Sequence, residues 1–286
     1  MLKILNRFFF GLRSKKEVFL IDSEHKKELL RISLINSSYI GIDTEFSWRK
    51  TYFPELSLLQ ISTESKIFLI DFLKIRKINF LESLLVENNK EIIMHSSRSD
   101  TTVLNTNLNI KLENVFDIQI AEKFINGGEI KNYGFIVSKY TGFLLDKSET
   151  YSNWSKRPLT PNQIAYASED VEFLIQISEK QKKILRKRNL LEKVLEASRK
   201  EAQLGNEDLF VSRLKKLKQP SATNKILFMW RENHAIERNI PPSFIFKDKY
   251  FKPLKDKIQK RSSKDEINEI LQDTDLTKDF FNKLIS

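Results

Sequence analysis

The sequence predicts an α/β protein in which a mixed sheet is flanked by helices and followed by a small all-α domain. Strand patterns open the chain, strand and helix patterns alternate after them, and the C-terminal part reads as helical throughout. A chain of 286 residues is long enough for two domains, which we place at residues 1–205 and 206–286.

The composition indicates a folded protein that favours polyanionic partners. Hydrophobic residues make up 40% of the chain, which provides a sizeable core. A net charge of +11 favours nucleic acid over anionic membrane, although a Lys-rich soluble surface explains the charge equally well. The absence of Cys excludes disulfides, thiolate nucleophiles and Cys-ligated metals, and it fits the cytoplasmic location that we expect.

We expect no membrane contact and no obligate protein partner. No stretch approaches the roughly 18 continuous apolar residues of a membrane span. The basic, apolar residues 1–13 are expected to form a strand or helix on the domain edge. Their apolar run is too short for a secretory signal, while a transit peptide or an amphipathic surface helix stays open.

The first half of the chain alternates between strand and helix patterns. Strands are expected at 39–46, 56–62, 66–72 and 91–97, helices at 78–89, 98–108 and 133–140, and a buried segment of either kind at 115–125. Side chains alternate across a strand, so Asp43 and Glu45 point to the same face of the first one. Asp100 lies in the first turn of its helix.

The helix expected at 159–177 has the clearest start in the chain. The stretch TPNQ at 160–163 supplies an N-cap, a proline at the first helical position and a reciprocal capping partner. Tyr166 and Asp170, four residues apart, lie together on the flank of the apolar stripe, where they can face a cleft.

Two carboxylates on one strand face repel each other, so their burial is costly unless a cation lies between them. Mg²⁺ and Mn²⁺ prefer such oxygen ligands. An acidic pair at i and i+2 is weak evidence alone, because most of the 38 acidic residues will be solvated. Together, however, Asp43, Glu45, Asp100, Tyr166 and Asp170 bring four carboxylates and a phenol from three elements, which predicts a metal cluster.

At these positions the chain resembles the ribonuclease D family of DEDDy 3′ to 5′ exonucleases. The first exonuclease motif reads IDTEFSWRKTYFPELSLLQI, the second HSSRSDTTVL followed by VFDIQIAEKFI, and the third YASEDVEFL. The segment LDKSETYSNWSKRPLT resembles the one that precedes the third motif in ribonuclease D. WRENHAIERNIPPSFIF resembles the helical HRDC domain, and the chain after the joint has room for one such unit rather than two.

The resemblance implies a ribonuclease H-like fold, an exoribonuclease activity and two divalent ions, Mg²⁺ or Mn²⁺. The implied catalytic residues are Asp43, Glu45, Asp100, Tyr166 and Asp170. The four acids would hold the ions, and the tyrosine would position the attacking water. Hydrolysis would release nucleoside 5′-monophosphates from RNA 3′ ends, with tRNA precursors carrying a single-stranded 3′ end as the implied substrate.

Aromatic and basic side chains near the motifs are expected to stack on bases and to pair with phosphates of a single strand. The candidates are Phe46, Trp48, Arg49, His95 and Trp154. Core packing explains Phe46 equally well, and a structural role is the simpler interpretation of His95.

Two alternative functions stay open from the sequence. A two-metal core of this kind cleaves either backbone, and discrimination rests on contacts to the 2′-hydroxyl that a sequence does not display. A DNA exonuclease is therefore one alternative. The other is a non-catalytic RNA-binding module on the same fold, although the presence of all five expected side chains argues against it.

Overall fold

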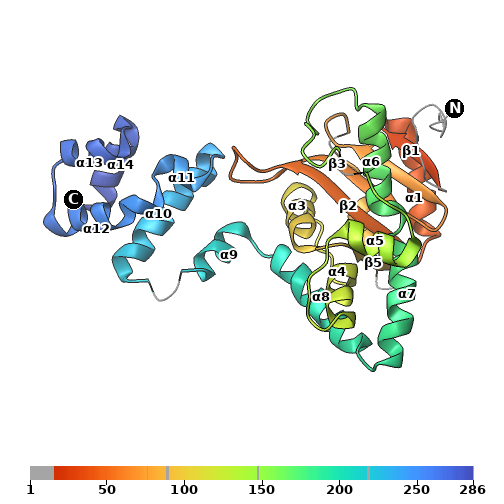
Figure 1. Ribbon diagram of the computed structural model, residues 1–286. Helices are drawn as coiled ribbons and strands as arrows, with labels where there is room; N and C mark the ends of the chain where they lie inside the picture. The colour runs from red at the N-terminus through yellow and green to blue at the C-terminus, as the bar shows by residue number, and fades with distance from the viewer. Residues whose placement is uncertain (1–15, 76, 88–89, 147, 218–219, 286) are drawn as a thin grey trace. The chain divides into compact units, whose positions relative to one another are not determined.

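The fold is known from a computed structural model, which describes residues 16–75, 77–87, 90–146, 148–217 and 220–285 (Figure 1). The expected element at residues 1–13 lies outside this part. The chain forms two compact units. Unit 1 combines the described residues up to Ser47 with Pro54–Glu207, and unit 2 combines Trp48–Phe53 with the described residues from Asp208 onward.

Unit 1 is built on a mixed sheet, as the sequence predicts, and the sheet has six strands among the described residues. The strands are β1 (Glu17–Ile21), β2 (Tyr39–Ser47), β3 (Glu55–Ser62), β4 (Lys66–Asp71), β5 (Glu91–Met94) and β6 (Val115–Asp117). Their order is β1-β4-β3-β2-β5-β6. The consecutive strands β2, β3 and β4 pair antiparallel, whereas β1 pairs with β4, β5 with β2 and β6 with β5 in parallel. β1 is a strand that the sequence patterns did not reveal.

Helices flank this sheet on both faces (Figure 1). They are η1 (Glu24–Lys26), α1 (Lys27–Ile35), α2 (Leu81–Leu85), α3 (Arg98–Leu108), α4 (Ile118–Ile125), α5 (Tyr133–Thr141), α6 (Pro161–Glu172), α7 (Leu174–Lys187) and α8 (Leu191–Gly205). One core lies between the sheet and α1, α2 and α3, and a second lies between the sheet and α4, α5, α6 and α7. The mixed sheet flanked by helices is therefore confirmed.

Three expected elements differ in extent from the structure. The helix expected at 78–89 is only the short α2. The buried segment 115–125 is divided into β6 and α4, because the Asp117 carboxylate accepts hydrogen bonds from the backbone N–H groups of Gln119 and Ile120 and so caps a new helix. The helix expected at 159–177 is interrupted at Phe173, where α6 gives way to α7.

The alternation in β2 is as predicted and determines what each face of the strand carries. Ile40 and Ile42 belong to the core under α1, α2 and α3, so Gly41, Asp43 and Glu45 face the helices on the other side. A Cβ on Gly41 would lie 2.4 Å from Ser62 Oγ and 3.2 Å from Leu174. The absent side chain thus lets α7 approach the strand closely.

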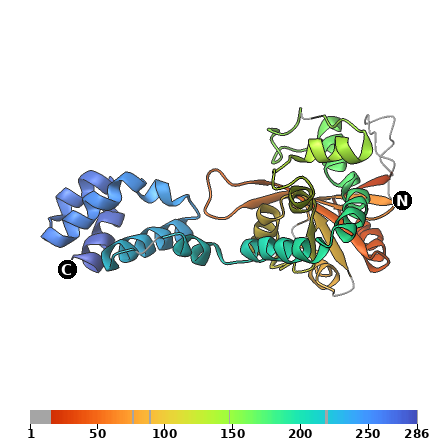
Figure 2. The ribbon, with the colours of Figure 1, turned by 60° about the horizontal axis from the view of Figure 1, so that its bottom comes forward.

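Unit 2 contains the C-terminal helices (Figure 2). It has a hydrophobic core of its own. The helices are α9 (Leu209–Lys215), α10 (Ala222–Arg238), α11 (Pro242–Ile245), η2 (Asp248–Tyr250), α12 (Phe251–Lys260), α13 (Lys264–Leu271) and α14 (Thr274–Leu284). Within this unit Tyr52 is fully buried and its hydroxyl donates to Glu232. The domain boundary at 205–206 and the HRDC-like character of these helices stay predictions. No helix among the described residues is long and apolar enough to cross a membrane.

Candidate metal centre

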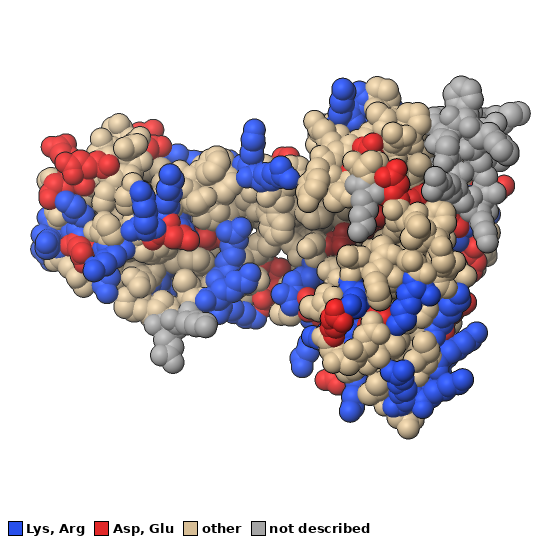
Figure 3. Space-filling model, in the orientation of Figure 1, with Lys and Arg blue, Asp and Glu red and all other residues tan. Residues whose placement is uncertain are grey.

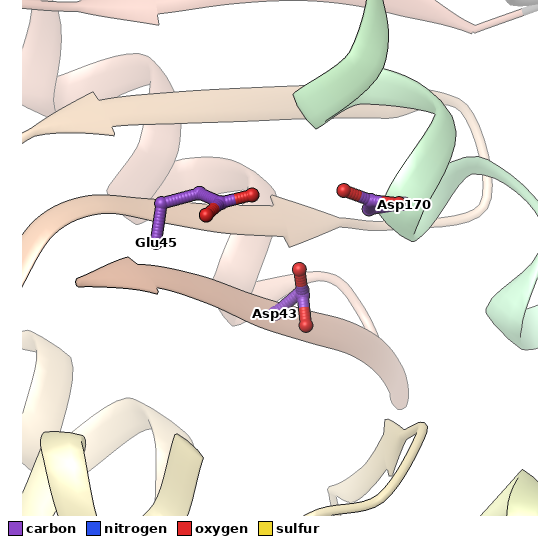
Figure 4. A group of neighbouring side chains, drawn as sticks. All are labelled: Asp43, Glu45 and Asp170. Atoms are coloured by element: carbon purple, nitrogen blue, oxygen red, sulfur yellow. The ribbon is translucent and has the colours of Figure 1, made fainter. Parts of the chain in front are cut away.

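Three of the predicted acids come together in unit 1. Asp43 and Glu45 project from β2, and Asp170 projects toward them from α6 (Figure 4). One carboxylate oxygen from each lies within 4.8 Å of the other two. All three side chains are half-buried, and in the described part of the chain no other group of acids and histidines gathers in this way.

Local structure explains why α6 delivers Asp170 to this point. The capping box predicted at 160–163 is present and defines where the helix begins. Farther along, Ser62 Oγ on β3 donates a hydrogen bond of 2.7 Å to the backbone carbonyl of Val171. This contact attaches the end of α6 to the sheet next to β2, and Asp170 is the residue just before it.

Asp100 lies near these acids without joining their cluster. It is buried in the first turn of α3, and its Oδ1 accepts a hydrogen bond of 2.5 Å from Thr44 Oγ1. Thr44 follows Asp43 on β2, so this hydrogen bond holds Asp100 beside the three carboxylates. Its negative charge still raises the pKa of Asp43, Glu45 and Asp170.

The electrostatics of the cluster are those of a site that requires a cation. Burial, followed by the charges of neighbouring acids, raises the pKa of Asp43 and of Asp170 well above the usual value. The same causes raise the pKa of Glu45 to about 9, and burial raises that of Asp100 to about 7. Hard oxygen ligands with unrelieved negative charge suit Mg²⁺ or Mn²⁺, so the residues present fit such ions.

Tyr166 lies beside the cluster on α6. Its hydroxyl is 3.5 Å from Thr150 Oγ1, and its ring centroid is 5.9 Å from that of Trp154. Burial, and then the charge of Asp170, raises the pKa of the Tyr166 hydroxyl. The phenol therefore remains protonated, which suits a hydrogen-bond donor better than a general base.

The candidate substrate contacts lie in different environments. Trp154 is only 6% exposed and packs in the core beneath α6 and α7, and Phe46 packs against the core on the other face. Trp48 and Arg49 belong to unit 2, where Trp48 Nε1 donates to the Tyr52 carbonyl and Arg49 is exposed. Substrate contact by these four residues stays a prediction.

His95 contacts Tyr133, for which the sequence predicts a helix and no role in the site. The His95 and Tyr133 rings are 5.4 Å apart, and His95 Nε2 is 3.3 Å from Gln119 Nε2. Burial lowers the pKa of His95, which favours the neutral ring. The Tyr133 hydroxyl donates to the backbone carbonyl of Glu169, and burial, followed by the charges of Asp170 and Asp43, raises the pKa of this hydroxyl. Tyr133 thus lies close to the cluster, and nothing in its local sequence marks it.

Comparison with known proteins identifies the family. A family model described as 3′-5′ exonuclease matches residues 18–186. Ribonuclease D of Desulfotalea psychrophila is 29% identical over 248 residues, which cover 82% of this chain and 65% of the relative. Ribonuclease D of Xanthomonas oryzae is 33% identical over 230 residues, which cover 77% of this chain and 63% of the relative. The chain thus spans slightly less than two thirds of these curated relatives.

Solved structures share the fold. Escherichia coli RNase D, described as an exoribonuclease involved in structured RNA processing, aligns with a TM-score of 0.79 and 23% identity over 93% of this chain and 72% of its own. Brucella melitensis NrnC with bound Mg²⁺ aligns with a TM-score of 0.56 and 19% identity over 65% of this chain and 92% of its own. With three acids converging on a sheet of this fold and a family match over residues 18–186, the chain belongs to the 3′-5′ exonuclease family, and its curated relatives are ribonuclease D proteins.

Proposed function

We propose that the chain is a metal-dependent 3′ to 5′ exoribonuclease that releases nucleoside 5′-monophosphates from RNA. The observation that carries this proposal is the convergence of Asp43, Glu45 and Asp170 within 4.8 Å at half-buried positions. Such a concentration of negative charge binds cations, and without a cation it destabilises the fold. The ribonuclease D relatives support RNA as the substrate.

Each side chain has a distinct part in the proposed mechanism. Asp43, Glu45 and Asp170 would hold the ions, and Asp100, held by Thr44, would support them. When bound, a pair of divalent ions supplies an activated water and stabilises the leaving 3′ oxygen. Tyr166 keeps its proton and orients the attacking water by a hydrogen bond. The Mg²⁺ in the related NrnC structure supports the choice of metal.

The surface charge suits a polyanionic substrate. Figure 3 shows Lys and Arg side chains on both units, with a group of them where α7 and α8 lie. Exposed residues around the end of α7 include Lys183, Arg186, Lys187 and Arg188. We propose that such residues hold the body of an RNA whose single-stranded 3′ end enters the site, with tRNA precursors as substrate and the cytoplasm as location.

Release of nucleotides from a 3′-end-labelled single-stranded RNA tests the proposal. With Mn²⁺ or Mg²⁺, the wild type should release nucleoside 5′-monophosphates one at a time. Asp43→Asn, which keeps the size of the side chain, should lower this rate by more than about 100-fold, because the loss of outer-shell partners alone costs 10–100-fold. EDTA should have the same effect on the wild type.

Matched substrates separate the alternatives. A DNA strand of the same sequence that is degraded faster than RNA would identify a DNA exonuclease. A wild type that binds RNA but releases nothing with any divalent ion would identify a binding module. A tRNA precursor with a 3′ extension should be shortened to the mature end, and indifference to the folded part of the RNA would contradict that substrate.

A further inference from the structure

A buried glutamine lies directly beside the carboxylate cluster. Gln60 on β3 is opposite Asp43 in the register of β2 and β3, and its side chain is 0% exposed. Neither its amide nitrogen nor its amide oxygen has a hydrogen-bond partner among the described residues. Buried polar side chains in native proteins are nearly always hydrogen-bonded, so an amide with both atoms unpaired requires an explanation.

Three neighbours show that Gln60 faces the cluster and not the opposite core. Directly opposed residues in antiparallel strands share a face, with Cβ atoms about 4.5–5.5 Å apart. On its other side Gln60 is opposite Leu69 of β4, which belongs to the core under α6 and α7. Ser62, two residues along β3, donates to Val171 on α6. The amide is therefore on the side from which Asp170 approaches, next to Asp43.

The chemistry of the amide suits the carboxylate that it faces. An amide offers two N–H donors, and a carboxylate that binds a metal is itself commonly hydrogen-bonded by a second group that sets its orientation. Among the described residues, no side chain is hydrogen-bonded to Asp43, and both amide atoms of Gln60 are unpaired. Because the two residues are direct cross-strand neighbours, rotation of their side chains can bring the amide to the carboxylate.

We propose that Gln60 is a positioning residue, whose amide N–H donates to the Asp43 carboxylate and holds it in the orientation that binds the metal ions. This inference rests on the proposed metal centre and adds a residue to it. Without the ions the amide is an unsatisfied buried group that destabilises the fold. Gln60 is thus placed for function at a cost in stability, as is common at active sites.

Two substitutions of buried polar side chains provide the comparison. Gln60→Met keeps the length of the side chain and removes the unpaired amide, whereas Ser178→Ala on α7 removes a buried hydroxyl that already donates to the Ile175 carbonyl in the same helix. The readouts are Mn²⁺ affinity, measured by calorimetry on the full chain, and the thermal midpoint of the metal-free protein. Neither readout requires turnover.

The proposal predicts opposite behaviour of the two variants. Gln60→Met should bind Mn²⁺ about 10- to 100-fold more weakly than the wild type while its metal-free thermal midpoint is equal or higher. Ser178→Ala should lower the midpoint and keep the Mn²⁺ affinity within about threefold, since the hydrogen bond that it loses is internal to α7, which carries none of the four acids. If Gln60→Met does not fold, Gln60→Asn, which withdraws the amide by one methylene, should also bind Mn²⁺ at least fivefold more weakly.

Three results would overturn the inference. Wild-type Mn²⁺ affinity in the Gln60 variant would show that the amide does not act on the site. If both variants showed the same decrease in thermal midpoint and the same decrease in Mn²⁺ affinity, the role of Gln60 would be structural only. A wild type that binds no Mn²⁺ would remove the metal centre itself, and with it the proposed function. A wild type that binds Mn²⁺ but cleaves no RNA would contradict the proposed function and leave Gln60 as a positioning residue.

Discussion

At the scale of single residues, the carboxyl groups of the site connect metal binding with stability. Without a cation, the fold favours their protonated forms, because burial and mutual repulsion disfavour the anions. With a cation, the same positions favour the anions. Binding of a cation is therefore expected to stabilise the fold as well as to complete the site.

A dependence of stability on pH follows from the raised pKa values of Glu45, about 9, and Asp100, about 7. A carboxyl whose pKa is higher in the folded than in the unfolded state stabilises the fold fully at low pH, and this stabilisation is lost as pH rises through the folded value. The thermal midpoint of the metal-free protein should therefore decrease as the pH is raised from 5 to 9. The decrease should be roughly 2–4 °C for each kcal/mol of unfolding free energy that is lost. Saturating Mg²⁺ should remove most of this slope.

The control for that experiment is Asp43→Asn, which removes one charge from the cluster. Its metal-free slope should be shallower than that of the wild type, because fewer anions repel one another at high pH. Equal slopes in the variant and the wild type would show that the pH dependence arises elsewhere in this basic protein.

A second residue-scale prediction concerns Tyr166→Phe. Because the hydroxyl stays protonated, its loss should lower kcat by about 10- to 100-fold, less than the ~10²–10⁴-fold of most general bases. The shape of the pH–rate profile should not change. Loss of a limb of that profile would instead identify Tyr166 as a base. Tyr140→Phe, which removes a hydroxyl bonded to Glu122 on α4, should reduce stability and leave kcat unchanged.

At the scale of secondary-structure elements, Gly41 allows β2 to pack closely against α7 just before the acidic pair. Gly41→Ala would place a Cβ 2.4 Å from Ser62 Oγ and 3.2 Å from Leu174, which should destabilise unit 1 by about 1–3 kcal/mol. Urea unfolding measures this loss. The double variant Gly41→Ala, Ser62→Ala lacks the hydroxyl that the new Cβ would meet. It should therefore lose less unfolding free energy than the two single variants lose together. Additive losses would contradict the packing that we describe.

At the scale of the whole molecule, we expect unit 2 to add RNA contacts to those proposed around α7. A chain truncated after Glu207 should bind structured RNA more weakly and with a smaller dependence on salt, because fewer Lys and Arg side chains meet phosphates. The kcat of the truncated chain on a short single-stranded RNA should change less than its affinity for structured RNA. Unchanged affinity for structured RNA would exclude this role of unit 2.

The truncation requires a control because Trp48–Phe53 belongs to unit 2. It removes Glu232, which accepts from the Tyr52 hydroxyl, and Asn239, whose Oδ1 accepts from the Tyr52 and Phe53 backbone N–H groups. Tyr52→Ala in the full chain disturbs the same segment and removes no positive charge. It should reduce stability while the salt dependence of RNA binding stays that of the wild type.

The sequence by itself determined the features that depend on neighbouring residues. Alternation along a strand placed Asp43 and Glu45 on one face, and the TPNQ stretch located the start of α6. Helical spacing placed Asp170 one turn after Tyr166. These regularities arise from backbone geometry within a few residues, so they can be predicted without knowledge of the fold.

Only the tertiary structure decided the features that depend on distant contacts. Asp100 lies beside the other three acids, where Thr44, 56 residues earlier, donates a hydrogen bond to its carboxylate. Tyr52 is buried through Glu232, 180 residues away, and Gln60 gains its significance from the strand beside it. Burial and charge at such positions result from the packing of elements that meet only in the folded chain, and no local pattern encodes that packing.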